Sequence, residues 1–444
     1  MKKKIVVIGA GIAGLTAAYN LSKDGYNVTL LESNSQLGGL GTYFKYKDGW
    51  IDKFYHCQMP SDDPLLKLIE DVGIKDQMYW KPTRMGFIVD GKRYSFNSPL
   101  DLLKFKPISF FQRLRFGVVS LSIRFLGKNK DLDNLPIEEW FQKLYGKTVW
   151  NKILKQLFLS KFGDHAGNLP SLYIWQRLGR EKNVATRGYI KGGVKTIIDA
   201  VETKIKTFGG EIQTNTKVRS LQKIENKTLV VLENNKSIEA DWVVSTIPIP
   251  SFANLVKDTN LQNSFTNPKL TYQGVVNALF FLKKPLDNFY WAPVVSSNTD
   301  FDGVVEMTEL IDKEQYNNHN AVYVMKYCNR DSDLFKEDES SIADRWEKQL
   351  VSLYPDLNFT EDDIADIKIF KAPFVEPIYP LGYSKLKPKM KIEDANIILA
   401  TSAQVYPNIT SWNASCSLAN KATNLLMKLE SSLDKDQKKY GEAS

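Results

Sequence analysis

Residues 4–32 read KIVVIGAGIAGLTAAYNLSKDGYNVTLLE, and this stretch decides the fold. Residues 4–8 are short, apolar and rich in β-branched side chains, as in a buried parallel strand. Residues 15–23 have the pattern of a helix that stops at Gly25, and residues 27–31 read as a second strand that ends at Glu32. The stretch therefore predicts a complete βαβ unit.

The glycines between the first strand and the helix have separate physical roles. Gly9 permits a tight turn, Gly11 lets the backbone approach a pyrophosphate, and Gly14 allows the helix to pack closely on the strand. Glu32 follows Gly14 by 18 residues, a spacing at which a carboxylate can accept hydrogen bonds from ribose hydroxyls. A glycine-rich turn without a ligand would need none of this context, so we expect a dinucleotide site. Its predicted residues are Gly9, Ala10, Gly11, Ile12, Ala13, Gly14, Glu32 and Ser33.

A second glycine pair follows immediately. Gly38 and Gly39, with Leu40 after them, could bring further backbone amides to the same diphosphate. From this point the sequence resembles the FAD-binding amine oxidase superfamily, which includes protoporphyrinogen oxidases, phytoene-type desaturases and, more distantly, UDP-galactopyranose mutases. Further motifs carry the resemblance to about residue 426: YIKGG at 189–193, Val218, DWVVSTIP at 241–248, IILATS at 397–402 and a helix after Pro407.

The resemblance implies an α/β fold with two discontinuous domains. The first is a Rossmann-like FAD-binding domain of the glutathione-reductase type, built from residues 1–80, 187–270 and 391–430. The second is a substrate domain of mixed sheet plus helices, from residues 81–186 and 271–390. Local patterns agree, because residues 99–180 have helical periodicity, whereas 275–282, 304–307 and 321–327 look like strands. The polar segment 431–444 is expected to be a flexible tail.

The resemblance also implies roles for particular residues. The first glycine loop would hold the pyrophosphate of FAD, Glu32 the adenosine ribose, and Gly38, Gly39 and Leu40 the diphosphate and ribityl region. Val218 would present its backbone to the adenine. The helix after Pro407 would aim its N-terminal amides at the flavin N1/O2 edge. Further contacts are expected from Thr246, Thr410, Ser411, Trp412 and Asn413.

Two departures from the family pattern concern the cofactor. The common Gly-Gly-Arg reads Gly38-Gly39-Leu40, which removes a cation near the diphosphate. The cysteine motif that links flavin covalently in some relatives is missing. The expected cofactor is therefore noncovalent FAD.

The sequence offers fewer candidates for catalytic residues than for cofactor contacts. Asp52, Tyr55 and His56 follow Gly39 at the interval where family members bring a loop beneath the isoalloxazine, so His56 could relay a proton or bind substrate. The alternative for His56 is a structural hydrogen bond. Glu306 lies in an apolar strand where an unpaired carboxylate would be costly, which suggests a site residue, although a solvated strand face explains it equally well. Residues 161–165, KFGDH, are interpreted as a surface cap rather than a site.

The net charge of +8 is concentrated in one region. Residues 81–130 contain eleven basic and two acidic residues, interleaved with aromatic and aliphatic side chains. This mixture is typical of amphipathic helices on a membrane surface, so residues 84–126 could make peripheral membrane contact; the alternative is a solvated basic face. No apolar run is long enough to span a bilayer. We expect no nucleic-acid partner, and the oligomeric state stays open.

The cysteines and histidines are too few and too scattered to indicate a disulfide framework or a metal site. Three cysteines and three histidines are widely scattered, so the chain has no disulfide framework and no metal-ligand cluster. We expect no metal site and a cytoplasmic location, with membrane association open. The basic start MKKK superficially imitates a signal peptide, but it runs directly into the glycine motif.

The expected function is that of an FAD-dependent oxidoreductase that accepts a hydride at flavin N5 from an organic substrate, lipophilic or anionic. No second GxGxxG motif is present, so an NAD(P)H-binding domain is not expected. Two alternatives remain at this stage. One is a non-redox enzyme like UDP-galactopyranose mutase that acts on a nucleotide sugar, and the other is a noncatalytic flavoprotein.

Overall fold

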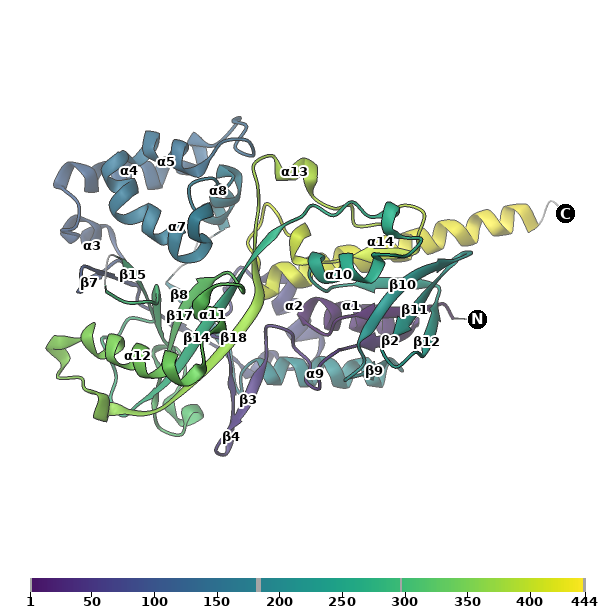
Figure 1. Cartoon of the computed structure of the whole chain (residues 1–444), viewed down its shortest axis with the longest axis horizontal. Helices are drawn as coiled ribbons and strands as arrows, with labels where there is room; N and C mark the ends of the chain where they lie inside the picture. The colour runs from purple at the N-terminus through teal and green to yellow at the C-terminus, as the bar shows by residue number, and fades with distance from the viewer. Residues whose placement is uncertain (1, 181–184, 296–297, 442–444) are drawn as a thin grey trace.

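A computed structural model describes residues 2–180, 185–295 and 298–441. Figure 1 shows two parts. A parallel sheet with its helices lies on the right together with both chain ends, and a mixed sheet with a group of helices lies on the left. Residues 442–444 of the expected tail lie outside the described residues.

The parallel sheet has five strands in the order β19-β13-β1-β2-β9. Strands β1, β2 and β13 are short and almost fully buried, as expected for a sheet covered on both faces. The bounds are β1 (Lys4–Ile8), β2 (Asn27–Leu31), β9 (Glu211–Gln213), β13 (Trp242–Ser245) and β19 (Ile397–Leu399).

The two faces of this sheet have different covers. Ile5 and Val7 face a core shared with four helices: α1 (Ile12–Lys23), α2 (Asp63–Asp71), α9 (Val194–Thr207) and α14 (Trp412–Gly441). Val6 and Ile8 face a second core, shared with an antiparallel three-stranded sheet and α10. These elements are β10 (Val218–Ile224), β11 (Lys227–Leu232), β12 (Ser237–Ala240) and α10 (Ile249–Val256).

The second large sheet has seven strands in the order β18-β14-β17-β16-β15-β6-β7. Neighbouring strands are antiparallel except for β15 and β6. One face of this sheet packs against α11 (Asp333–Lys336) and α12 (Glu339–Ser352). The other face packs against the hairpin of β3 (Tyr43–Tyr46) and β4 (Gly49–Asp52). The strands are β6 (Gly86–Val89), β7 (Lys92–Ser95), β14 (Thr271–Leu282), β15 (Trp291–Val295), β16 (Gly303–Glu306), β17 (Asn320–Cys328) and β18 (Ile364–Ile378).

A group of helices lies above this sheet in Figure 1 and is called the cap here. It consists of α3 (Pro99–Lys104), α4 (Phe110–Leu126), α5 (Ile137–Tyr145), α6 (Lys147–Val149), a π-helical stretch (Trp150–Leu154), α7 (Lys155–Phe162) and α8 (Ser171–Arg180). The remaining elements are two small antiparallel pairs, β3 (Tyr43–Tyr46) with β4 (Gly49–Asp52) and β5 (Met78–Pro82) with β8 (Thr186–Ile190), and α13 (Tyr383–Leu386).

The predicted α/β fold, with a Rossmann-like parallel sheet and a separate mixed sheet, is confirmed. The helix predicted at 15–23 begins earlier, at Ile12, because Gly11 is extended and serves as its N-cap. Helix α14 continues to Gly441, so it includes residues 431–441 of the segment expected to be a flexible tail.

Candidate functional site

The two glycine loops touch each other in front of helix α1. The Gly38 amide donates to the Ala10 carbonyl at 2.8 Å, and Gly11 pairs with Gly38 as an isolated parallel bridge. A Cβ placed on Gly14 would lie 1.8 Å from the Gly9 carbonyl oxygen, so close packing requires glycine there. Within the described part of the chain, a Cβ on Gly11 would meet nothing closer than the Gly39 Cα, at 3.9 Å. Gly11 therefore borders open space.

This space suits an anion. Gly11 is the N-cap of α1 and has no side chain, so it supplies no side-chain acceptor for the first-turn amides of Ile12, Ala13 and Gly14. Unsatisfied amides at a helix N-terminus, together with the helix dipole, favour phosphate oxygens. The loop geometry thus fits the diphosphate of a dinucleotide.

Glu32 lies at the end of β2 beside these loops and is 6% exposed. Its Oε2 accepts from the Ala10 amide at 2.8 Å, and its Oε1 accepts from the Asn34 amide at 2.9 Å and the Ser33 hydroxyl at 3.2 Å. The Thr216 amide donates to the Glu32 carbonyl at 2.7 Å, which brings the segment leading into Val218 alongside. Glu32, Ser33 and the start of β10 therefore lie together, as expected for the adenosine end of the site.

Thr246 has a supporting position behind the first loop. Its hydroxyl is 3.0 Å from both the Ile8 and the Gly9 carbonyl oxygens. A hydroxyl has one proton to donate, so these carbonyls share it. Thr246 therefore braces the turn at Gly9 rather than presenting a free donor to a ligand.

The second glycine loop also contacts the start of α14. A Cβ on Gly41 would lie 2.1 Å from the Trp412 ring, and that ring is 5.4 Å from the ring of His56. Ser411 caps α14, since its hydroxyl accepts from the Ala414 amide at 3.1 Å. The structure thus joins the loop after Gly39, the N-terminus of α14 and the His56 segment.

The other residues expected to contact the cofactor near α14 and the second loop differ in whether their side chains are already engaged within the protein. The Asn413 Oδ1 accepts from the Leu65 amide at 3.2 Å, so this side chain holds α2 to α14. The Thr410 hydroxyl is buried without a hydrogen bond to the described residues, although it lies near the Tyr379 hydroxyl. The Leu40 side chain is 37% exposed. The Thr410 hydroxyl is thus a buried polar atom that a ligand could engage.

His56 is held as a neutral imidazole. Burial lowers its pKa to about 4, and its Nδ1 lies 2.8 Å from the Phe54 carbonyl oxygen. Because a carbonyl can only accept, Nδ1 bears the proton and Nε2 keeps its lone pair. At neutral pH His56 can therefore accept a hydrogen bond but cannot act as a cation.

Tyr55 is half-buried on a phenol-rich wall. Its ring centroid lies 6.4 Å from that of Tyr323, and its hydroxyl is hydrogen-bonded to Tyr327. Burial raises the pKa of Tyr55 to about 12, which the nearby cations Arg177 and Arg187 partly oppose. Tyr55 stays protonated at neutral pH and can donate a hydrogen bond.

Glu306 lies elsewhere: it is 1% exposed, so it is not on the solvated strand face that the sequence allowed, and the structure does not bring it together with Tyr55 and His56. In β16, Val305 faces Tyr323, whereas Val304 and Glu306 face the α12 side of the sheet. The Glu306 Oε1 accepts from the Leu286 amide at 3.0 Å, and burial raises the pKa of the carboxyl to about 7. Strand alternation separates it from Tyr55 and His56, a position that could not be read from the strand sequence alone.

The sequence is matched by a family model over residues 12–409, nearly the whole chain. That model describes the flavin-containing amine oxidoreductases. The chain belongs to this family. This amine oxidoreductase is thus an FAD-dependent oxidoreductase by family. Its substrate is not determined by membership.

Individual relatives are distant. The 15-cis-phytoene desaturase of Arabidopsis thaliana is 23% identical over 424 residues, covering 86% of this chain and 74% of the desaturase. A provisionally assigned protoporphyrinogen oxidase from Exiguobacterium sp. 255-15 superposes with a TM-score of 0.76 at 14% identity, covering 96% of this chain and 99% of that one. A putrescine oxidase bound to putrescine superposes with a TM-score of 0.71 at 12% identity and the same coverage. At these identities the structural likeness shows the fold alone.

In this amine oxidoreductase, sequence reasoning placed Asp52 in the loop with Tyr55 and His56 but missed its burial and its anchoring role. Asp52, at the end of β4, is 2% exposed. Its Oδ2 accepts from the Tyr189 hydroxyl at 2.7 Å and its Oδ1 from the Val194 amide, the first of α9, at 3.1 Å. The Tyr323 hydroxyl donates to the Asp52 carbonyl at 2.7 Å. Asp52 thus anchors the segment that leads to His56.

A second missed group lies where the cap meets β18. Glu376 is 3% exposed and forms an ion pair of 3.1 Å with Lys161, and the Tyr173 hydroxyl also donates to it. Lys161 is therefore not a surface cap as interpreted from 161–165, whereas Asp164 and His165 are exposed. The apolar surroundings of Glu376 in the sequence were the available signal. Tyr173 in turn packs on the Tyr379 ring at 5.3 Å.

The ion pair gives a testable stability effect. Lys161→Met should leave the buried Glu376 carboxylate without its cation and lower the free energy of unfolding by about 2 kcal/mol. Adding Glu376→Gln to Lys161→Met removes the uncompensated charge and should recover most of the loss. Urea unfolding of wild type, both single variants and the double variant measures the coupling. Equal, additive losses in the two single variants would contradict the pairing.

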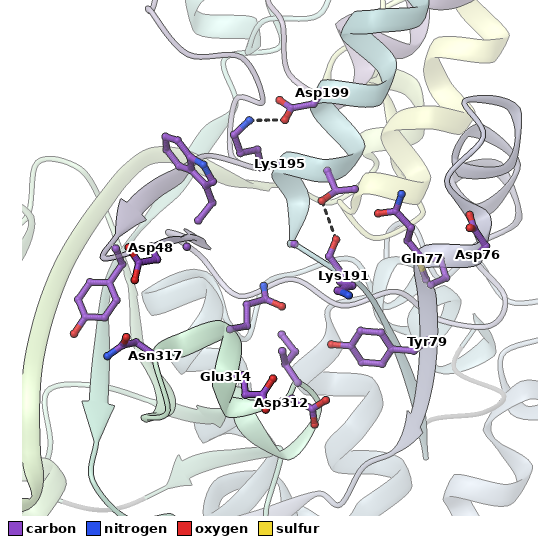
Figure 2. Close-up of a pocket in the computed structure, with 18 residues that line it drawn as sticks. Asp48, Asp76, Gln77, Tyr79, Lys191, Lys195, Asp199, Asp312, Glu314 and Asn317 are labelled. Atoms are coloured by element: carbon purple, nitrogen blue, oxygen red, sulfur yellow. Dashed lines mark hydrogen bonds and ion pairs between the residues drawn. The ribbon is translucent and has the colours of Figure 1, made fainter.

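A cavity of about 1020 Å³ lies beside the β3–β4 hairpin and the start of α9. Figure 2 shows its wall from the β3–β4 hairpin and the start of α9, with the Lys195–Asp199 ion pair and the Tyr79 side chain at its edge. Helix α9 borders both regions, because Lys195 and Asp199 line the cavity whereas Ile198 lies next to Gly38 of the second glycine loop. None of the expected site residues lines this cavity.

Proposed function

We propose that the glycine loops and Glu32 hold the ADP half of noncovalent FAD. The contact between Gly11 and Gly38, with open space beside Gly11 and free amides at the start of α1, is the observation that carries this proposal. A diphosphate there would run between two backbone segments without needing the cation that Leu40 replaces. Glu32 and the segment before Val218 would take the ribose and the adenine.

The flavin ring end is proposed to lie near Trp412, His56 and the N-terminus of α14. Bound flavin supplies a hydride acceptor at N5 for a substrate carbon. The α14 amides would stabilise negative charge at the N1/O2 edge, since a helix N-terminus carries partial positive charge. Thr410 offers the buried hydroxyl that could add a hydrogen bond there.

The surroundings of Tyr55 support a lipophilic substrate with an anionic or carbonyl group. Phenol rings dominate the region: Tyr55, Tyr323 and Tyr327 on one side, and Tyr173, Tyr379, Tyr383 and Tyr406 on the other. Such rings offer apolar area together with hydrogen bonds. Arg177 and Arg187 beside Tyr55 favour a negative or polar end of the substrate over a cationic one.

His56 is proposed to accept a proton or hydrogen bond through Nε2. His56→Asn keeps a short donor for the Phe54 carbonyl but removes Nε2, so kcat should fall about 100-fold while flavin stays bound. Steady-state kinetics and the flavin spectrum of the variant measure both effects. The matched control His165→Asn changes an exposed histidine and should leave both unchanged. A His56→Asn enzyme with wild-type kcat would remove His56 from the proposal.

The reaction type is tested by anaerobic mixing. The proposed oxidoreductase should lose its flavin absorbance when a suitable organic substrate is added, with one equivalent of product formed per flavin. An enzyme like UDP-galactopyranose mutase would need prior reduction and would then convert nucleotide sugar without consuming electrons. Turnover of nucleotide sugar by the reduced protein, with no bleaching by any lipophilic donor, would overturn the hydride-transfer proposal.

Peripheral membrane contact through residues 84–126 is part of the same proposal. Helix α4 leaves an apolar side exposed in this segment.

A further inference from the structure

Helix α4 carries apolar side chains on two opposite faces. Val119 and Ile123 point into the cap core, and Phe116 packs against the same core. On the other face a stripe recurs at alternating spacings of three and four residues, which places its members along one line of the helix. This stripe comprises Phe111, Leu114, Val118, Leu121 and Phe125, which are 80%, 44%, 65%, 84% and 77% exposed.

The exposed apolar side chains are concentrated here. Within the described part of the chain, fourteen large hydrophobic residues are exposed, and eight of them lie in residues 100–125. The other three of these eight are Leu100, Leu103 and Phe110, on or beside α3. A contiguous patch of this kind marks an interaction surface, whereas the remaining six are scattered single residues.

Positive charge predominates at the patch, and Asp101 of α3 is the one acidic residue within residues 100–130. Residues 104–130 contain seven basic residues and no acidic residue: Lys104, Lys106, Arg113, Arg115, Arg124, Lys128 and Lys130. The Arg113 guanidinium donates to the Leu103 carbonyl and sits over the Phe110 ring, while Arg115 donates to the Leu144 carbonyl at 2.7 Å. These contacts hold two cations at the border of the apolar stripe.

We propose that the α3–α4 surface docks on an anionic lipid bilayer. Helix α4 would lie in the membrane plane, with the stripe in the headgroup–acyl boundary and the basic residues among anionic headgroups. A second copy of the chain fits less well, because joining two such faces would oppose two basic borders. No helix in residues 2–180, 185–295 or 298–441 is long and apolar enough to cross a bilayer.

The docked surface would adjoin the proposed substrate region. The Trp175 indole of α8 donates to the Ile123 carbonyl of α4 at 2.9 Å, and α8 also carries Tyr173, the partner of Glu376. A lipophilic substrate could thus pass from the bilayer to the cap helices. This inference deepens the proposed membrane contact, and its test below does not depend on the flavin chemistry.

Flotation with lipid vesicles tests the proposal on the full-length holoprotein. Wild type should bind phosphatidylcholine vesicles that contain phosphatidylglycerol, and added salt should weaken the binding. Pure phosphatidylcholine vesicles should bind at least about 10-fold more weakly, because the basic border then lacks anionic headgroups.

Two variants separate the apolar and charged contributions. The triple variant Phe111→Asn, Leu121→Asn, Phe125→Asn should lower vesicle partitioning by about 100-fold. The variant Lys104→Ala, Lys106→Ala, Lys128→Ala, Lys130→Ala should lower it by at least about 10-fold and abolish the preference for phosphatidylglycerol. A matched control, Phe208→Asn with Leu386→Asn, changes residues 40% and 50% exposed outside the patch and should bind as wild type.

Several results would overturn the membrane assignment. One is a wild-type protein that does not float with phosphatidylglycerol vesicles. Another is a folded triple variant, with normal circular dichroism and flavin spectrum, that floats as well as wild type. A third is a wild-type protein that forms a dimer and binds no vesicles, together with a triple variant that is a monomer. This result would show that the stripe is the contact with a second copy of the chain.

Discussion

Gly11→Val should yield a folded protein that cannot retain flavin. The added side chain would enter the open space beside the two glycine loops, where a Cβ meets no described backbone closer than 3.9 Å. The fold should therefore tolerate it, whereas the cofactor diphosphate should not. Overlap of this kind costs about 1–3 kcal/mol, or roughly a 5- to 150-fold weaker Kd for FAD, before any lost amide contacts are counted.

The visible spectrum of the purified variant and a titration with FAD measure this effect. Gly117→Ala is a matched control, since this α4 glycine has room for a Cβ 3.4 Å from Leu102 and lies in the cap rather than in the glycine loops. Gly14→Val should behave differently from Gly11→Val, because its Cβ would strike the Gly9 carbonyl and disturb folding itself. A Gly11→Val protein with wild-type flavin content would contradict the proposed path of the diphosphate.

Asp52→Asn should remove a large part of the pH dependence of stability. Burial raises the pKa of Asp52 from 3.8 to about 7, although hydrogen bonds from Tyr189 and Val194 oppose the rise. An acid with a raised folded pKa favours the protonated folded state, so its contribution is complete below pH ~4 and is lost as pH rises through about 7. Asparagine does not titrate, so the stability of the variant relative to wild type should rise across that window.

The expected change in that relative stability is on the order of 4 kcal/mol between pH 4 and pH 8. Urea unfolding of both proteins at several pH values, with saturating FAD, measures it, and the difference cancels the titration of other groups. Tyr189→Phe removes a donor to the carboxylate and should shift the window to higher pH. Parallel pH curves for wild type and Asp52→Asn would show that Asp52 does not titrate as described.

The sequence predicted those helices and strands whose pattern is set by residues close to one another in the chain. Strands β1 and β2 coincide with the expected 4–8 and 27–31, because β-branched runs between glycines specify buried strands. Helix α1 begins three residues before the expected Leu15, because its first turn contains Gly14, which helix propensity disfavours but packing on Gly9 requires. Tertiary contact decided that boundary.

The site was less predictable because it depends on which face a side chain occupies. Glu306 and Glu376 both lie in apolar strand sequences, yet one faces α12 and the other meets Lys161 and Tyr173 of the cap. Asp52 draws its partners from residues 189 and 194, far along the chain, and no local pattern announces them. The glycine loops could be predicted from the sequence because their expected ligand contacts come from the backbone and their glycines are closely spaced in the chain.

The most direct test is a fluorescence titration of the flavin-free protein with FAD and, separately, with FMN. If the first glycine loop and Glu32 grip the ADP half, FAD should bind at one per chain with at least about 100-fold higher affinity than FMN, and denaturation should release it unchanged. Equal affinity for the two flavins, or no binding of either, would contradict the account.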